Sequence, residues 1–461
     1  MIKVQLERKQ QRLSKKQLKS NLTPHEKSDL HGNPDSDMYI KYNWLICLTM
    51  FLVFMILGFV LDSPSNLLSG IVRILLSSSV LTTDYLAVGG VGAALIHNAC
   101  FLLLLLVVVL LSRTRLTGKI MVHIFMPVGF AFFGMNILNI LPFILGVYFY
   151  ARRQKQLFSN YITNAFNFGS LGPIVSFIAL HSGLPFYFSI PLAIMCGTLI
   201  GFFGVPFAAS CSKLHRGFTL YNTGFTGGFI GILVFGLLSV FRIEVIRPDI
   251  LIEQTSLPLV VFLIIYSVFI LLLGIILASN KGPAESGKSK SYYKILKCSG
   301  YGEVIYESYG AEMTYINMGI MGLLATGFAL LMGATLTGPV MAGILSVIGY
   351  AALGKHPLNT IPIILGVTLS GFVAGADLSG TGFVMTGLFG TALAPVTGKF
   401  GLIPGFVAGF IHYAIARMTS NFHGGFVLYN NGFASGIVAI LLVNILINLP
   451  QNIFRRNNTN S

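Results

Sequence analysis

Charged residues are scarce in this chain. Asp, Glu, Lys and Arg make up 10% of its 461 residues, whereas soluble domains carry about a quarter. Acidic residues are the scarcest, with 15 Asp and Glu against 30 Lys and Arg. Because 54% of the residues are hydrophobic and the mean hydropathy is +0.78, a soluble domain is excluded. We conclude that the chain is a polytopic membrane protein.

Metal-binding and redox motifs are also missing. The five cysteines show no ligand or redox spacing, and the nine histidines form no His-Glu-x-x-His pattern. The sequence therefore implies no metal and no cofactor, and it assigns no catalytic residue.

The net charge of +15 would suit a nucleic-acid partner, but its distribution argues against one. Nine of the 30 basic residues precede Asn43, and most others fall in short segments between apolar runs. That is the positive-inside pattern of a protein embedded in a lipid bilayer. The sequence therefore predicts a multi-pass protein of the cytoplasmic membrane, with no nucleic-acid partner, and it is compatible with a homo-oligomer.

Fourteen apolar segments can be drawn, seven in each half of the chain. They cover 43–61, 85–112, 119–136, 138–151, 162–180, 186–210 and 217–241, then 258–279, 314–334, 338–354, 357–374, 377–397, 401–418 and 424–446. The predicted fold class is all-α: a bundle of two homologous repeats with up to 14 membrane segments, some short or re-entrant. The predicted parts are a basic tail (1–42), repeat 1 (43–241), an external linker (242–257), repeat 2 (258–446) with a cytoplasmic loop (280–312), and a C-terminal tail (447–461).

Internal duplication is the most informative feature of the sequence. The string HRGFTLYNTGFTGG at residues 215–228 returns as HGGFVLYNNGFASG at residues 423–436, with nine identical positions. Gly-x-x-x-Leu-Asn-x-x-Pro-x-Ile-Leu-Gly-Val at 134–147 recurs at 354–367, and Leu-Gly-Pro at 171–173 recurs as Leu-Ala-Pro at 393–395. We also match Tyr85, Gly89 and Gly92 to Tyr315, Gly319 and Gly322.

An odd number of segments per repeat predicts that the second repeat enters the membrane from the opposite side. With both termini cytoplasmic, 26 basic residues lie inside and 4 outside, and Lys355 is counted in an inside loop. If one segment per half is re-entrant, the parity changes and the repeats are parallel.

Prolines and asparagines at equivalent positions of the two repeats are the first candidates for a site. Pro142 and Pro362 interrupt apolar runs, which membranes tolerate where protein or a watery cavity satisfies the freed carbonyl. Asn139 and Asn359 precede them. These residues either line a central cavity or belong to ordinary kinked, packed helices.

A Tyr-Asn pair opens the last segment of each repeat, Tyr221 with Asn222 and Tyr429 with Asn430. Such side chains need partners inside hydrocarbon. They either line a pore or tie helices together.

Secondary candidates are ionisable residues near the membrane. His215 and His423 precede the Tyr-Asn segments, at the expected interface with water, where they cap helices or contact a solute. Asp377 is either functional or a marker of an external loop. For His97 and His412, structural hydrogen bonding is the expected use.

The paired His-x-Gly-Phe-x-Leu-Tyr-Asn-x-Gly-Phe strings, with the Leu-Asn-x-x-Pro and Leu-small-Pro islands, resemble an uncharacterised bacterial membrane-protein family whose domain occurs twice per chain. The resemblance covers about residues 40–446 and implies membrane location and duplication, but no activity. A weaker likeness is to urea transporters, where each inverted half carries a Gly-Leu-x-x-Tyr-Asn-Gly segment on a pore helix. Here Gly217 to Asn222 and Gly425 to Asn430 look similar, although the following glycine comes one residue late.

Taken together, these patterns predict a transporter or channel for a small polar solute. Facilitated diffusion fits better than ion coupling because few acidic residues are available to bind cations. One alternative is an intramembrane enzyme acting on lipid, in which Asp377 converges with His412 or His423. Another is a non-transporting scaffold or sensor, with a plugged interface and with Tyr221 and Asn430 saturated by protein partners.

Overall fold

The structure is a computed structural model, and it describes residues 34–280 and 291–448. The chain divides into two units at Ile46. The described part of the first unit is the beginning of a helix, α3 (Pro34–Leu61), which starts inside the predicted tail. The second unit, residues 47–461, contains both repeats. The predicted tails, 1–42 and 447–461, lie mostly outside the described residues.

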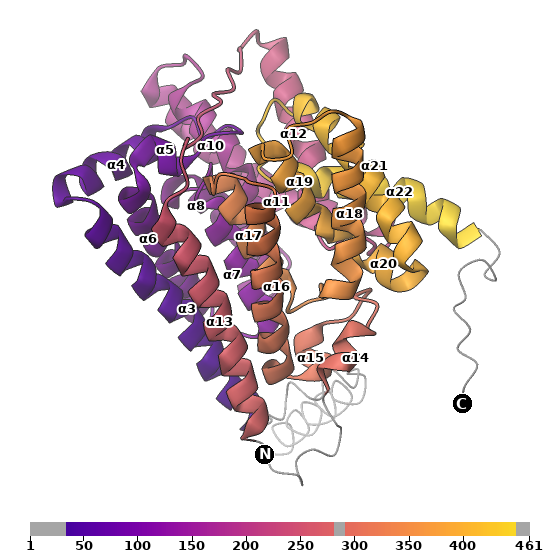
Figure 1. The fold of residues 1–461 in the computed structure, drawn as a ribbon. Helices are drawn as coiled ribbons and strands as arrows, with labels where there is room; N and C mark the ends of the chain where they lie inside the picture. Colours follow the sequence, from indigo (N-terminus) through magenta and orange to yellow (C-terminus); the bar gives the residue numbers. More distant parts are fainter. Residues whose placement is uncertain (1–33, 281–290, 449–461) are drawn as a thin grey trace, which may run out of the picture. The chain divides into compact units, whose positions relative to one another are not determined.

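Helices make up the described regular structure (Figure 1). The first half continues with α4 (Pro64–Leu76), α5 (Tyr85–Gly89), α6 (Val91–Leu111), α7 (Gly118–Phe130), α8 (Ile137–Arg153), η1 (Phe158–Tyr161), α9 (Ile162–Phe168), η2 (Gly169–Leu171), α10 (Gly172–Leu180), α11 (Phe186–Leu214) and α12 (Asn222–Val240). The second half consists of α13 (Leu257–Ser279), α14 (Tyr292–Leu296), α15 (Ile305–Tyr309), α16 (Ala311–Leu331), α17 (Gly338–Tyr350), α18 (Pro357–Val373), α19 (Thr381–Gly390), η3 (Thr391–Leu393), α20 (Ala394–Phe400), α21 (Leu402–Phe422) and α22 (Asn430–Asn448).

Nine helices of the described chain are long and apolar enough to cross a membrane, and shorter apolar helices accompany them. A helix of about 20 residues spans the hydrocarbon core. Each of the fourteen predicted segments contains a helix or an interrupted helix. The all-α, polytopic fold class is therefore confirmed.

The two repeats follow the same plan, and the plan corrects one sequence match. The pair α5 and α6 has 5 and 21 residues, as does the pair α15 and α16. Glycines with positive φ join each pair, Gly90 at 93° and Gly310 at 86°. Tyr85 thus lies on α5, whereas Tyr315 lies inside α16, and these two tyrosines are not equivalent. The match was wrong because tyrosine and glycine recur by chance in segments of such limited composition.

Equivalent helices of the two repeats pack against each other in opposite directions. Gly129 near the end of α7 faces Ala342 near the start of α17, where a Cβ added to Gly129 would lie 2.8 Å from the Ala342 Cα. Gly349 near the end of α17 faces Val122 near the start of α7. These contacts exchange under a two-fold axis perpendicular to the helices. The repeats are therefore inverted.

Glycine also sets the packing within each repeat. A Cβ on Gly146 of α8 would lie 2.1 Å from the Thr198 carbonyl oxygen of α11. At the equivalent place in repeat 2, a Cβ on Gly366 of α18 would lie 2.0 Å from the Phe406 carbonyl oxygen of α21. Only glycine allows this close approach of two helix backbones. These helix pairs hold the elements that surround the centre.

The segment between the repeats contacts both of them, and its contacts with repeat 1 involve a buried carboxylate. In residues 242–256, Ile250 forms an isolated bridge with Thr83. The buried Asp84 carboxylate accepts hydrogen bonds from the Leu86 N–H at 2.9 Å and the Ile252 N–H at 3.1 Å. Burial raises the pKa of Asp84 to about 6 although these N–H groups stabilise the charged form.

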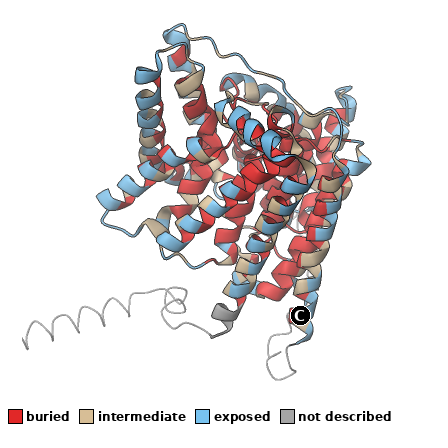
Figure 2. Ribbon diagram, turned by 90° about the vertical axis from the view of Figure 1, so that its left-hand side faces the viewer, coloured by how far each residue is buried: buried red, intermediate tan, exposed pale blue. Residues whose placement is uncertain are grey.

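Figure 2 shows buried residues on the inner parts of the helices and exposed residues on the outer parts, and many of the exposed residues are large and apolar. On α11, for example, Tyr187, Met195 and Phe203 are exposed. Large exposed apolar surfaces of this kind suit contact with lipid rather than water. The chain is a multi-pass membrane protein.

Candidate functional site

The helices that begin with the Tyr-Asn pairs, α12 and α22, cross at the interface between the repeats. A Cβ on Gly224 would lie 3.0 Å from the Gly432 Cα, and one on Gly432 would lie 2.9 Å from the Gly224 Cα. Past the crossing, the Thr219 and Ser435 hydroxyls are 2.8 Å apart. The duplicated elements therefore meet, in antiparallel directions, through their small residues.

Each repeated string contains a hydrogen bond between its histidine and its asparagine. His215 Nε2 is 2.9 Å from Asn222 Oδ1, and His423 Nε2 is 2.9 Å from Asn430 Oδ1. Each asparagine amide nitrogen donates to the helix before it, Asn222 to the Ala208 carbonyl and Asn430 to the Ala416 carbonyl, both at 3.0 Å. The hydrogen bond within each His-x₆-Asn string thus closes the loop between two helices. Both histidines are buried, and they occupy the C-cap positions of α11 and α21.

The loops that precede α12 and α22 reach into the opposite repeat. The Leu220 N–H donates to the Ala392 carbonyl at 3.0 Å, and the Leu428 N–H donates to the Ser170 carbonyl at 3.1 Å. Ala392 and Ser170 lie in η3 and η2, where the chain interrupts a membrane-depth helix in each repeat. Each helix break thus supplies a carbonyl to the loop of the other repeat. This arrangement satisfies irregular backbone that hydrocarbon would not tolerate.

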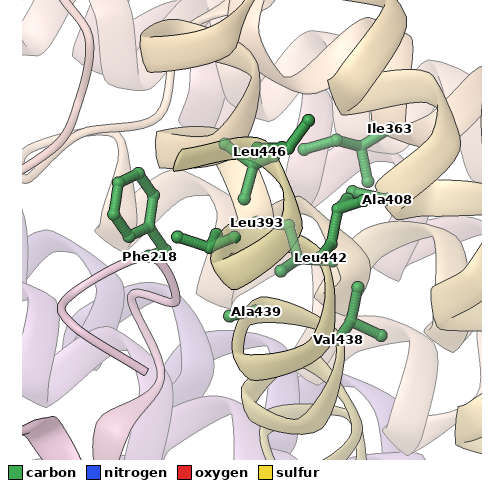
Figure 3. Close-up of a cluster of buried hydrophobic side chains, with 10 residues drawn as sticks. Phe218, Ile363, Leu393, Ala408, Val438, Ala439, Leu442 and Leu446 are labelled. Atoms are coloured by element: carbon green, nitrogen blue, oxygen red, sulfur yellow. The ribbon is translucent and has the colours of Figure 1, made fainter. Parts of the chain in front are cut away.

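An aromatic side chain anchors each of these loops. Phe218, from repeat 1, lies beside Leu393 in a cluster of repeat 2 side chains (Figure 3). Its ring centroid is 4.4 Å from that of Tyr301 and 5.3 Å from that of Phe400. In the other loop, the ring centroid of Phe426 is 5.3 Å from that of Phe177. The loops are therefore held by packing as well as by hydrogen bonds.

A polar cluster lies where the two loops meet, and we call Tyr221, Ser346, Tyr350, Lys355 and Tyr429 the central cluster. The Tyr221 hydroxyl is 2.7 Å from Ser346 Oγ, and the Tyr429 hydroxyl donates to the Tyr350 hydroxyl at 3.2 Å. The Tyr221 and Tyr429 ring centroids are 4.8 Å apart. All five side chains are buried. The structure thus brings Tyr221 and Tyr429 together.

Lys355 is the member of the central cluster that sequence reasoning missed. Its ammonium donates to the Tyr221 hydroxyl and lies 4.5 Å and 5.2 Å from the ring centroids of Tyr221 and Tyr350. The side chain is 0% exposed. Its side chain is buried rather than exposed in a loop, because the turn between α17 and α18 folds into the protein. The repeat alignment carried a signal, since Lys355 stands where repeat 1 has Met135.

Asn139 and Asn359 close the turns before α8 and α18. Asn139 Oδ1 accepts from the Asn136 N–H at 2.9 Å and its amide nitrogen donates to the Gly134 carbonyl at 2.9 Å. Asn359 Oδ1 accepts from the His356 N–H at 2.9 Å and its amide nitrogen donates to the Gly354 carbonyl at 2.8 Å. Both asparagine side chains therefore hydrogen-bond to the backbone of their own turns. They stabilise the turn that carries Lys355 in repeat 2 and the turn that carries Met135 in repeat 1.

The two candidate prolines lie within α8 and α18. A Cβ added to Gly197 of α11 would lie 2.7 Å from Pro142 Cβ, so Pro142 packs between helices. Pro362 is half-buried in α18. No hydrogen bond or ring contact joins either proline to the central cluster among the described residues.

The secondary candidates lie apart from one another. The His97 ring lies edge-on to that of Tyr85, with centroids 5.6 Å apart, and His412 Nε2 is 3.2 Å from Asn431 Oδ1. Asp377 lies exposed in the loop before α19, where its Oδ1 accepts from the Ser379 hydroxyl at 2.7 Å. Hydrogen bonds from Ser379 hold the pKa of Asp377 below its usual value. In the described chain, no contact joins Asp377 to His412 or His423, as an acid-base pair would require.

Pockets open to the surface lie away from the central cluster. One is lined by residues of α18 and α21, including Ser370, Tyr413 and Arg417. Another is lined by Arg152 and Lys155 at the end of α8. The central cluster is closed to solvent in this structure because its members are buried.

The structure consists of two inverted helical repeats, each with an interrupted helix, and buried polar side chains lie where the repeats meet. These features define a class: the polytopic membrane proteins built from inverted repeats. Within this class, the chain belongs to the family described as "Protein of unknown function (DUF1576)", whose model matches residues 63–240 and 285–448. The matches begin after α3 and after α13, so each covers one repeat without its first long helix. No curated protein and no solved structure matches the chain, and the likeness to urea transporters is left without support.

Proposed function

We propose that the protein is a membrane transporter for a small polar solute, which crosses at the interface between the repeats by facilitated diffusion. The arrangement at the central cluster supports this proposal most directly. Inverted repeats whose interrupted helices meet near mid-membrane are the plan on which many transporters place their substrate site. Here both helix breaks, both Tyr-Asn loops and five buried polar side chains meet in one place.

In this proposal, the structure is the closed state of the transporter. A path through the interface requires the loop of residues 215–221 to separate from α22, because Thr219 and Ser435 hold them together at 2.8 Å. In alternating access, one repeat moves against the other around a fixed site. A covalent link across this contact should therefore stop transport.

A cysteine pair in place of this contact tests the proposal. The double variant Thr219→Cys with Ser435→Cys replaces each of the two hydroxyl groups by a thiol of similar size. Because the hydroxyl oxygens are 2.8 Å apart, the two sulfur atoms can form a disulfide after small shifts of the side chains. The five native cysteines are first replaced by alanine. Uptake of a panel of small polar solutes into proteoliposomes should occur with the reduced double variant, stop on oxidation and return with dithiothreitol.

The single variants Thr219→Cys and Ser435→Cys are the matched controls, and oxidation should leave their uptake unchanged. Uptake that persists in the fully oxidised double variant would remove the interface as the path. A reduced protein that moves none of the solutes would remove transport.

A non-transporting scaffold or sensor is the second candidate, and one observation favours it. Asn430 Oδ1 accepts from both His423 and Thr419, and its amide nitrogen donates to Ala416, so protein groups saturate this side chain. Absence of flux in the reduced protein would support this function.

We also infer that the chain lies in the cytoplasmic membrane with both termini in the cytoplasm. The distribution of basic residues supports this orientation, and it remains strongly one-sided when the buried Lys355 is left out of the count. Labelling of a single cysteine placed near either terminus, from one side of sealed vesicles, tests it.

A further inference from the structure

Lys355 is a buried basic residue whose contacts in the described chain include no carboxylate. They are the hydroxyl of Tyr221 and the faces of Tyr221 and Tyr350, and the Lys355 carbonyl accepts from the Asn317 amide at 2.7 Å. Hydroxyls and aromatic faces stabilise an ammonium, but they do not neutralise it. Removing an ammonium from water without an ionised partner is costly.

The fold itself does not require this cation. Met135 occupies the equivalent position of repeat 1, after the equivalent glycine and before the equivalent turn, and it is also fully buried. Two copies of the same turn thus form, one with a thioether and one with an ammonium. The amino group of Lys355 therefore serves something other than the turn.

The surroundings of Lys355 favour a negative partner. The hydroxyls of Ser346, Tyr350 and Tyr429 lie in the same cluster and can donate hydrogen bonds. The 19-residue helices α12 and α22 begin immediately after Tyr221 and Tyr429, the two tyrosines that the repeated strings contribute to the cluster. Helix N-termini carry partial positive charge and favour anions.

We infer that the solute bound at the central cluster carries a single carboxylate, and that Lys355 is its counter-ion. This inference depends on the proposed function, since it names the class of the transported solute. One lysine, with no arginine among its contacts in the described residues, suits a monovalent carboxylate better than a phosphate, which usually meets several cations or a bidentate arginine. Binding of the solute would supply the negative charge that Lys355 lacks in the closed protein.

Matched solutes and matched variants test the inference. L-lactate and lactamide differ in charge but have nearly the same shape, and inorganic phosphate and glycerol complete the set of probes. In detergent, 10 mM lactate should raise the midpoint of thermal unfolding of the wild-type protein, and lactamide should not. Lys355→Met, which copies the residue of repeat 1, should unfold at the same or a higher temperature than the wild type but should no longer respond to lactate. Lys355→Arg should retain part of the response.

Flux in proteoliposomes separates the two proposals. We expect lactate uptake to fall at least about tenfold in Lys355→Met, with Lys399→Met unchanged as the control for loss of a lysine. Equal uptake of lactamide and lactate, unaffected by Lys355→Met, would overturn the carboxylate inference and leave transport standing. Stabilisation by lactate that requires Lys355, without flux of any solute, would support the site and overturn transport. A wild-type protein that neither binds nor moves lactate, or that prefers phosphate, would overturn the inference.

Discussion

Gly224 and Gly432 touch at the crossing of α12 and α22, each leaving room for the backbone of the other. A Cβ added to Gly224 would also lie 2.8 Å from the Tyr429 ring, so a methyl group there pushes on the central cluster. This contact brings the backbones of the duplicated strings together, and it makes their crossing sensitive to side-chain volume.

Gly224→Ala and Gly432→Ala should therefore destabilise the protein. Overpacking of this kind costs about 1–3 kcal/mol. Gly236→Ala is the matched control, because it lies on the same helix with nothing within 4 Å of an added Cβ. The midpoint of thermal unfolding in detergent should fall for the first two variants and stay the same or rise for the third. Equal midpoints for all three would contradict the crossing.

The hydrogen bond between histidine and asparagine should be worth more in repeat 1 than in repeat 2. After His423→Ala, Asn430 Oδ1 keeps the hydroxyl of Thr419 at 2.8 Å, whereas Asn222 Oδ1 has no such second donor among its described hydrogen bonds. A double-mutant cycle of His215→Ala with Asn222→Ala should give a coupling of about 1 kcal/mol in the free energy of unfolding.

The cycle of His423→Ala with Asn430→Ala should give a smaller coupling, and Thr419→Val should raise it toward the value of repeat 1. A larger coupling in repeat 2 with Thr419 present would show that other contacts dominate.

Phe218 should contribute strongly to stability. It is 4% exposed and joins a repeat 1 loop to a repeat 2 cluster. Truncation of a buried phenylalanine to alanine costs about 3–5 kcal/mol. The exposed Phe241, at the end of α12, provides the control, and Phe241→Ala should leave the unfolding midpoint nearly unchanged. Similar midpoints for the two variants would mean that the loop is not anchored by Phe218.

Asp84 should make stability depend on pH. Its pKa is raised from 3.8 to about 6, so the folded protein binds this proton more tightly than the unfolded chain does. The contribution of Asp84 to the free energy of unfolding should thus increase as the pH falls from about 6 toward 4, by up to about 3 kcal/mol. The unfolding midpoint of the wild type relative to Asp84→Asn should rise over that interval. A flat difference between the two proteins would contradict a buried, titrating Asp84.

Much of the fold was predictable from the sequence because membrane helices and repeats leave strong patterns. The apolar segments located the helices, and the repeated Tyr-Asn string located the crossing of α12 and α22. The matched Leu-Gly-Pro and Leu-Ala-Pro islands correspond to the helix breaks at η2 and η3. These signals are local or are duplicated, so a single chain suffices to find them.

The candidate site was harder to predict because its contacts are not local. Whether Asn139 faces a cavity or its own turn depends on the backbone of Gly134, and sequence spacing does not distinguish the two. Lys355 follows Gly354 in a short polar stretch, which looks like a loop until the turn is folded into the protein. The available signal was a difference between the repeats: Lys355 of repeat 2 aligns with Met135 of repeat 1. A search for identical positions does not find such a difference.

The exchange of backbone hydrogen bonds between Leu220 and Ala392, and between Leu428 and Ser170, makes the two half-proteins obligate partners. Either half alone would leave an amide of its loop and a carbonyl of its helix break unpaired inside the hydrocarbon. Joining both copies in one polypeptide therefore guarantees a one-to-one stoichiometry.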